Sequence, residues 1–193
     1  MNKTVIADLI GNLLSFRAKS RNLQTMKTIL LTAIALLLPF LASAQNKKLE
    51  PVYDETLNPF EQIDAAVAKA SAEGKFVICQ VGGNWCPWCL KFAAFIKADA
   101  DISKIIEDNF VYIHVNYRPG KTADAAKAQQ NKALLKRLNN FGRFGYPVFV
   151  VLDGTGKVIH LQDSSYLEDG DGYDKKKVLS FFKHWTYSAV NAE

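Results

Sequence analysis

The chain has 193 residues, of which 49% are hydrophobic, and 24 Lys and Arg against 19 Asp and Glu give it a formal net charge of +5 at pH 7. Five of the basic residues and one of the acids lie in residues 1–44, so the remaining 149 residues carry 19 basic and 18 acidic side chains. This near-neutral balance gives no argument for a nucleic-acid or membrane partner. These residues fit one domain with a hydrophobic core, and three cysteines make a poor disulfide framework.

The first 44 residues look like a leader rather than part of the fold. Met26-Lys27 is basic, residues 29–41 are apolar, and Ala42-Ser43-Ala44 offers a small-x-small cleavage site. We therefore expect a signal peptide over residues 26–44, and we expect residues 1–25 to be an over-extended gene start. The apolar run is short for a bilayer span, which argues against an uncleaved membrane anchor. Export, to the periplasm if the source is a Gram-negative bacterium, would place the cysteines where disulfides persist.

The rest of the chain divides into a short arm and one domain. Residues 45–57 are polar and predict a loosely held arm, and residues 58–193 predict the domain. Its first helix begins at the Asn58-Pro59 cap and ends at Gly74. The elements expected after it are a strand at 76–81, a helix after Cys86 that breaks at 99–101 and continues at 102–108, a strand at 110–116, a helix at 122–139, a hairpin of 147–152 and 157–161 around the turn 153–156, a loop at 163–174 and a helix at 175–187. This order, βαβα followed by ββα, predicts an α/β fold in which helices cover both faces of a central mixed sheet.

The most informative motif is Trp85-Cys86-Pro87-Trp88-Cys89, at the junction of a predicted strand and a predicted helix. Two cysteines separated by two residues can close and reopen a disulfide, and this context favours a redox motif over half of a zinc site. If Cys86 is the N-cap, its sulfur faces free backbone N–H groups and the positive end of the helix dipole, which lowers the pKa of the thiol. Pro87 at the first helical position suits this start. We therefore predict that Cys86 attacks a substrate disulfide and that Cys89 resolves the mixed disulfide.

Other interpretations of the cysteine pair stay open: a structural bridge, a metal-ligand pair, a Cu(I)-binding metallochaperone and a redox-inactive binding module. A zinc site needs two more ligands, and the sequence has no second CxxC and no His pair with ligand spacing. We accordingly expect no metal and no bound cofactor. Cys79, inside a predicted strand, is expected to be a small buried hydrophobe, with a third redox thiol as the alternative.

Three motifs carry a resemblance to a known family: Asn84 to Cys89, Gly145-Tyr146-Pro147 before a strand, and the closing hairpin and helix. Over residues 58–187 the chain resembles thioredoxin-fold proteins. It is most similar to secreted thioredoxin-like proteins with a Trp-Cys-x-x-Cys centre, and to the C-terminal domain of the transmembrane thiol–disulfide interchange protein. The resemblance implies a thioredoxin-like three-layer α/β/α sandwich that exchanges disulfides with protein substrates and with a redox partner.

The resemblance also implies roles for residues around the cysteine pair. Pro147 would be a cis-proline lying against the disulfide, and the backbone of Tyr146 would offer hydrogen bonds to an extended substrate. An ordinary trans-proline that opens an edge strand is the alternative. Trp85 and Trp88 are expected to wall the disulfide and, with Pro87, to give an apolar docking patch for substrate, unless Trp85 is simply core.

The chain departs from the family at two places. Gln80 stands six residues before Cys86, where thioredoxins have a buried Asp that helps to move the proton of the second cysteine. Glutamine cannot titrate, so resolution by Cys89 must use water or another group, or run more slowly. Residues 119–139 look like helix added beyond the smallest thioredoxins, and this addition either selects a partner near the active site or is inert packing.

The direction of electron flow follows less directly from these residues. Stabilising the Cys86 thiolate at a helix cap favours the reduced form, which makes a stronger oxidant. The resemblance to thioredoxin-like reductants argues the other way. We predict a disulfide reductase, with a disulfide oxidase or isomerase as alternatives.

Overall fold

A mixed four-stranded sheet forms the centre of the computed structural model, which describes residues 49–120 and 124–192. The strand order is β2 (Phe110–Asn116), β1 (Phe76–Gly82), β3 (Val148–Leu152) and β4 (Val158–Asp163). β1 pairs in parallel with β2 and antiparallel with β3, and β3 pairs antiparallel with β4. Every residue of β1 and of β3 is buried, which explains why their sequences are nearly continuous apolar runs.

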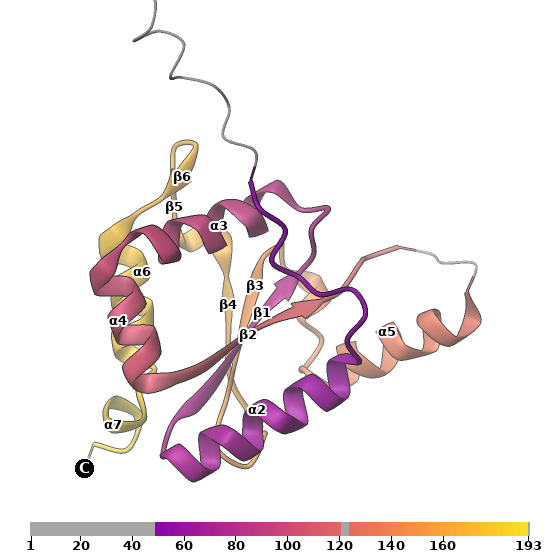
Figure 1. Cartoon of the computed structure of the whole chain (residues 1–193), viewed down its shortest axis with the longest axis horizontal. Coiled ribbons are helices and arrows are strands. Elements are labelled where there is room, and N and C mark those ends of the chain that lie inside the picture. Colours follow the sequence, from indigo (N-terminus) through magenta and orange to yellow (C-terminus); the bar gives the residue numbers. More distant parts are fainter. Residues whose placement is uncertain (1–48, 121–123, 193) are drawn as a thin grey trace, which may run out of the picture. The chain divides into compact units, whose positions relative to one another are not determined.

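Helices cover both faces of this sheet (Figure 1). The helices are α2 (Pro59–Glu73) and α5 (Ala125–Arg137) on one face, and α3 (Pro87–Ala98), α4 (Ala100–Asn109) and α6 (Lys175–His184) on the other, with a short α7 (Tyr187–Val190) after them. The predicted three-layer α/β/α sandwich with a central mixed sheet is therefore confirmed. Within the described ranges, no helix is long and apolar enough to cross a membrane. The predicted signal peptide at 26–44 and the predicted gene-start extension at 1–25 lie outside the described residues.

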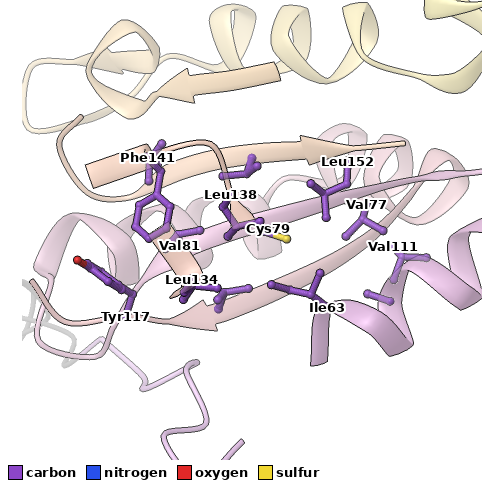
Figure 2. Close-up of a cluster of buried hydrophobic side chains, with 14 of the residues drawn as sticks. Ile63, Val77, Cys79, Val81, Val111, Tyr117, Leu134, Leu138, Phe141 and Leu152 are labelled. Carbon is purple, nitrogen blue, oxygen red and sulfur yellow. The ribbon is translucent and has the colours of Figure 1, made fainter. Parts of the chain in front are cut away.

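One of the two large hydrophobic clusters lies between the sheet and the helices α2 and α5 (Figure 2). Ile63 of α2, Leu134 of α5 and Phe141 are each at most 1% exposed there. Cys79 of β1 belongs to the same cluster and is fully buried, and burial raises the pKa of its thiol to about 12. The thiol is protonated at neutral pH, so the prediction that Cys79 is a small buried hydrophobe is confirmed.

Side-chain caps set the helix boundaries that the sequence predicted. At the start of α2, Asn58 Oδ1 accepts a hydrogen bond from the backbone N–H of Phe60 at 2.9 Å. Gly74 ends the same helix with φ of 64°, a left-handed conformation that glycine adopts without strain. Asp99 lies between α3 and α4 and accepts hydrogen bonds from the first turn of α4, so the predicted break at 99–101 is the N-cap of a new helix.

Two helices are shorter than their patterns predicted. α5 begins after its N-cap Asp124 and ends at Arg137 rather than spanning 122–139, of which residues 122 and 123 are not described. α6 ends at His184 rather than near residue 187. There Thr186 accepts a hydrogen bond from the backbone N–H of Ala189 and caps α7, so the side chain competes with continuation of the helix.

Residues 163–174 hold more structure than the predicted loop. A 3-10 turn, η2 (Ser164–Leu167), leads into a hairpin of β5 (Glu168–Asp169) and β6 (Gly172–Tyr173). Tyr173 is 8% exposed, and its ring centroid lies 4.8 Å from that of Phe92 in α3. The local sequence is polar, so the hairpin could not be recognised from hydrophobic periodicity; packing against a distant helix anchors it.

Candidate active site

The two cysteines of the motif form a disulfide at the start of α3, with their Cα atoms 5.3 Å apart. Cys86 is the N-cap of the helix and has an extended backbone, and Pro87 occupies the first helical position, as predicted. Cys86 Sγ accepts a hydrogen bond from the backbone N–H of Cys89 at 3.2 Å. A thiolate on Cys86 would gain this hydrogen bond and the positive end of the helix dipole, so the site favours ionisation of Cys86.

The two cysteines differ in their access to solvent. Cys86 is 4% exposed and Cys89 is fully buried, while Pro87 between them is exposed. A disulfide that approaches from solvent therefore meets Cys86 first. Cys89 can be reached only after the sulfur of Cys86 has moved or reacted.

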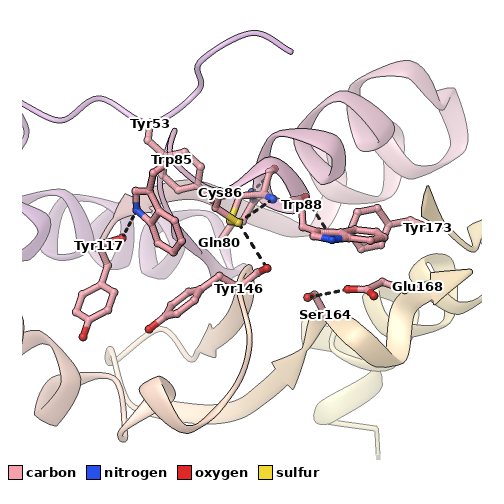
Figure 3. The surroundings of a disulfide bond; sticks show 11 residues. Tyr53, Gln80, Trp85, Cys86, Trp88, Tyr117, Tyr146, Ser164, Glu168 and Tyr173 are labelled. Carbon is pink, nitrogen blue, oxygen red and sulfur yellow. Dashed lines mark hydrogen bonds between the residues drawn. A yellow bond between two sulfur atoms is a disulfide. The ribbon is translucent and has the colours of Figure 1, made fainter. Parts of the chain in front are cut away.

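Aromatic side chains flank the disulfide on two sides (Figure 3). On one side Trp85 and Tyr146 make an edge-to-face contact with ring centroids 5.5 Å apart, and on the other Trp88 and Tyr173 do the same at 5.6 Å. All but Tyr173 pack against the small cluster formed by the cysteines. Trp85 Nε1 also donates to the Tyr117 carbonyl oxygen at 3.0 Å, which fixes the indole. The two tryptophans therefore stand where the sequence placed them, and whether they dock substrate stays a prediction.

The loop before β3 also contacts the active-site disulfide. The peptide bond between Tyr146 and Pro147 is cis, so the expectation of a cis-proline is confirmed and the trans alternative is wrong. Pro147 is buried, and the carbonyl oxygen of Tyr146 lies 3.5 Å from Cys86 Sγ. Since sulfur hydrogen bonds are long, this carbonyl can accept a hydrogen bond from the S–H group of a reduced Cys86.

The sequence reasoning missed Tyr53, which comes from the N-terminal arm. Tyr53 is 4% exposed and belongs to the same buried cluster as Cys86 and Cys89. Asn84 holds its backbone: Oδ1 accepts from the N–H groups of Val52 at 3.0 Å and Tyr53 at 3.1 Å, and Nδ2 donates to the Tyr53 carbonyl at 2.8 Å. The prediction of a loosely held arm is therefore wrong at residues 52 and 53. No local pattern signals a contact between residues 31 or 32 positions apart.

Gln80, which stands where thioredoxins have a buried Asp, is fully buried, and its side-chain amide makes hydrogen bonds through both nitrogen and oxygen. Its Nε2 donates to Tyr53 Oη at 2.7 Å and to the Cys89 carbonyl oxygen at 3.0 Å. Its Oε1 accepts from the Tyr112 hydroxyl at 2.6 Å. Gln80 therefore ties the arm, β2 and α3 together at the base of the site, a role that a side chain without a titratable proton can fill.

His114 of β2 lies beside this network. Its ring centroid is 5.3 Å from that of Tyr53 and 5.5 Å from that of Tyr112. Its Nε2 is buried and has no hydrogen-bond partner among the described residues. Burial without a partner disfavours the charged ring, and it lowers the pKa of His114 to about 4.

The depressed pKa of His114 makes stability depend on pH. Because the ring titrates near 6.5 in the unfolded chain and at about 4 in the folded one, the unfolded state binds this proton more tightly. Stability from the neutral ring is fully present above pH 6.5 and falls as the pH drops toward 4. We expect the loss in unfolding free energy between pH 7 and pH 4 to shrink by about 2 kcal/mol in His114→Gln, by urea denaturation at both pH values. An equal loss in both proteins would contradict this assignment.

Comparison with known proteins identifies the family. The thioredoxin-like domain family matches residues 63–168, more than half of the chain. The chain belongs to the thioredoxin-like family. The resemblance stated from the motifs is therefore confirmed, and this thioredoxin-like chain has the fold and the close cysteine pair of a thiol–disulfide oxidoreductase.

Solved structures match the chain at low sequence identity. A disulphide isomerase from Xylella fastidiosa Temecula1 is 20% identical and superposes with a TM-score of 0.57, covering 70% of this chain and 96% of its own. A thioredoxin from Thermus thermophilus is also 20% identical, with a TM-score of 0.44 and coverage of 63% and 81%. A DsbH oxidoreductase is 17% identical, with a TM-score of 0.43 and coverage of 78% and 92%. No match to the sequence was found among curated proteins.

Proposed function

We propose that this thioredoxin-like protein is an exported disulfide reductase that passes two electrons from the Cys86–Cys89 dithiol to disulfides of protein substrates without a bound cofactor. The observation that carries the proposal is the position of Cys86 Sγ. It caps α3, accepts the N–H of Cys89, and lies 3.5 Å from the Tyr146 carbonyl that precedes the cis-proline. Export rests on the signal peptide predicted at residues 26–44, and the compartment would be the periplasm in a Gram-negative bacterium.

The first step is attack by the Cys86 thiolate on one sulfur of a substrate disulfide. A bond forms between Cys86 Sγ and that sulfur, the substrate S–S bond breaks, and the other substrate sulfur leaves as a thiolate that takes up a proton. The helix-cap hydrogen bond favours the thiolate that this step needs. The exposed Pro87 leaves the approach to Cys86 open.

The second step frees the substrate. The Cys89 thiol loses its proton to water, and the resulting thiolate attacks Cys86 Sγ. The mixed disulfide breaks, the second substrate thiolate leaves, and the Cys86–Cys89 disulfide forms. A partner with a more reducing dithiol must then return two electrons to the protein.

Substrate docking is assigned to the surfaces that flank the disulfide. Trp85 and Trp88 offer apolar area with Pro87 between them, and the Tyr146 backbone before Pro147 offers a hydrogen-bonding edge for an extended segment. Such a site suits any accessible disulfide with adjacent apolar residues, which fits an enzyme that acts on several proteins.

The reducing direction is supported by the modest stabilisation of the Cys86 sulfur. In the described part of the chain the Cys89 backbone N–H donates to this sulfur, the Tyr146 carbonyl oxygen lies 3.5 Å from it, and no cationic side chain donates to it. Strong stabilisation of this thiolate would favour the reduced form and make the protein an oxidant. One backbone N–H stabilises it less, which favours donation of electrons.

Reduction of insulin by dithiothreitol, followed as turbidity, tests the activity. We expect the wild type to accelerate the reaction and Cys86→Ser to fall to the rate without protein, because serine cannot form the mixed disulfide. Cys79→Ala is the matched control and should keep the wild-type rate, since Cys79 is a buried thiol of the core. Equal rates for the wild type and Cys86→Ser would end the enzyme proposal.

The reduction potential of the pair tests the direction in the same preparation. Redox buffers with Trp85 and Trp88 fluorescence as readout should give a value near the roughly −270 mV of thioredoxin. A value near about −120 mV would identify a disulfide donor and overturn the reductase assignment.

A further inference from the structure

We propose that the Tyr53 hydroxyl donates a hydrogen bond to Cys89 Sγ when the disulfide is open, and so stabilises the thiolate that resolves the mixed disulfide. The role of this hydrogen bond in the reaction rests on the proposed function. The hydrogen bond itself is argued from the contacts that Tyr53 makes beside Cys89.

The Tyr53 hydroxyl and the Cys89 sulfur approach the same point above β1. A Cβ atom built on Gly82 would lie 2.5 Å from Cys89 Sγ and 3.0 Å from Tyr53 Oη. The two atoms therefore flank one small space next to a residue that has no side chain. Both residues belong to one buried cluster, so water neither screens a hydrogen bond between them nor competes for it.

The hydrogen bonds of Gln80 direct the Tyr53 proton away from the amide. The Cys89 carbonyl can only accept, so the Gln80 atom facing it at 3.0 Å must be the nitrogen. The same nitrogen donates to Tyr53 Oη at 2.7 Å. Tyr53 Oη therefore accepts a hydrogen bond from Gln80, and its own O–H group can donate a hydrogen bond elsewhere.

An opened Cys89 needs such a donor. A thiol that is fully buried resists ionisation, because burial disfavours the charged form. Among the buried polar side chains of the described residues, which are Gln80, Ser164 and Thr186, none is an acid that could remove the proton. A hydrogen bond to the thiolate lowers the free energy of the charged form and so raises its population.

Tyr53 acts as a donor and not as a base. Burial raises the pKa of its hydroxyl well above the usual value, so the group keeps its proton at every pH at which the enzyme works. The titratable or charged groups that face the site are Cys86 of α3, Tyr112 and His114 of β2, Tyr146 before β3, Tyr173 of β6, and Glu168, which acts on Tyr173. Of these, His114 packs edge-on against the Tyr53 ring and Tyr112 donates to Gln80 Oε1, and no hydrogen bond joins either of them to a cysteine sulfur in the described chain.

The test separates the two thiols by mixing reduced protein with 5,5′-dithiobis(2-nitrobenzoate) in a stopped-flow instrument. Attack by Cys86 releases one thionitrobenzoate, and resolution by Cys89 releases a second, so two absorbance phases report the two steps. In Tyr53→Phe we expect the pH midpoint of the second phase to rise by about one unit while the first phase keeps its midpoint. The thiolate population at neutral pH then falls about tenfold, and the higher nucleophilicity of a more basic thiolate offsets part of this, leaving the second phase about three- to fivefold slower.

Tyr112→Phe is the matched control, because it removes a buried hydroxyl bonded to the other end of Gln80. Its second phase should keep the wild-type midpoint. An unchanged midpoint in Tyr53→Phe, or an equal rise in both variants, would overturn the proposal. Asn84 holds the Tyr53 backbone, so the phenylalanine variant keeps the arm in place. Absence of the first phase in the wild type would instead mean that Cys86 is not nucleophilic, which tests the proposed function separately.

Discussion

Replacing Cys89 by serine is expected to stop the reaction at the mixed disulfide and to hold substrate proteins on Cys86. Residue 89 is the buried neighbour of Cys86, and with serine there no thiol of the pair remains to attack Cys86 Sγ and release the substrate. A serine hydroxyl cannot displace a thiolate from sulfur under these conditions, so multiple turnover of insulin should disappear. Non-reducing electrophoresis of Cys89→Ser expressed in its own compartment should show bands of higher mass that dithiothreitol removes.

The control for trapping is the double variant Cys86→Ser, Cys89→Ser, which has no active-site thiol and should give no such bands. Cys79→Ser, Cys89→Ser should trap as well as the single variant, because Cys79 lies in the core between the sheet and α2 and α5. Covalent complexes that persist in the first double variant would assign the reactivity to Cys79 and contradict the order of attack. Identifying the trapped proteins would also name the substrates that the sequence leaves open.

Local signals in the sequence were enough for most of the framework. Asn58 and Gly74 bound α2, Cys86 and Pro87 start α3, and the cis bond precedes Pro147, each through interactions within a few residues or a motif of known geometry. The buried strands were recognisable because they lie between two helical layers and are apolar on both faces. These features are determined by residues that are close together in the sequence, so a single sequence is enough to predict them.

The parts that the sequence could not predict depend on contacts between distant residues. Tyr53 lies in a polar arm, and what fixes it is a single amide side chain, Asn84, more than thirty positions away. Tyr173 lies among Asp and Gly residues and is buried because Phe92 of α3 receives its ring. Gln80 stood out as a missing acid, yet its role follows from three partners on three different elements. A pattern within one segment contains none of this information.

A methyl group added at Gly82 is expected to disrupt the active site by colliding with Cys89 and Tyr53. Gly82 ends β1, and its carbonyl oxygen accepts a hydrogen bond from the Tyr117 N–H at 2.6 Å, so the backbone cannot withdraw. The new Cβ would lie 2.5 Å from Cys89 Sγ, a distance that real Cβ contacts do not show, and 3.0 Å from Tyr53 Oη. Neither neighbour can move into space, because both are buried. We expect Gly82→Ala to lower the free energy of unfolding by about 3 kcal/mol, at the upper end of the range for overpacked cores, by urea denaturation of the oxidised protein.

The matched control is Gly145→Ala, in the loop before Tyr146, where an added Cβ meets no atom within 4 Å. Gly82 and Gly145 both lack the positive φ that would strain an alanine, so the two variants differ in packing rather than in backbone conformation. Gly145→Ala should therefore unfold like the wild type. The two variants should also differ in their thiol chemistry, because the Cβ added in Gly82→Ala displaces Cys89 Sγ from the position in which it meets both Cys86 and Tyr53. Wild-type stability in Gly82→Ala would mean that the space beside Cys89 is larger than the structure has it, and the contact proposed for Tyr53 would then lose its geometric basis.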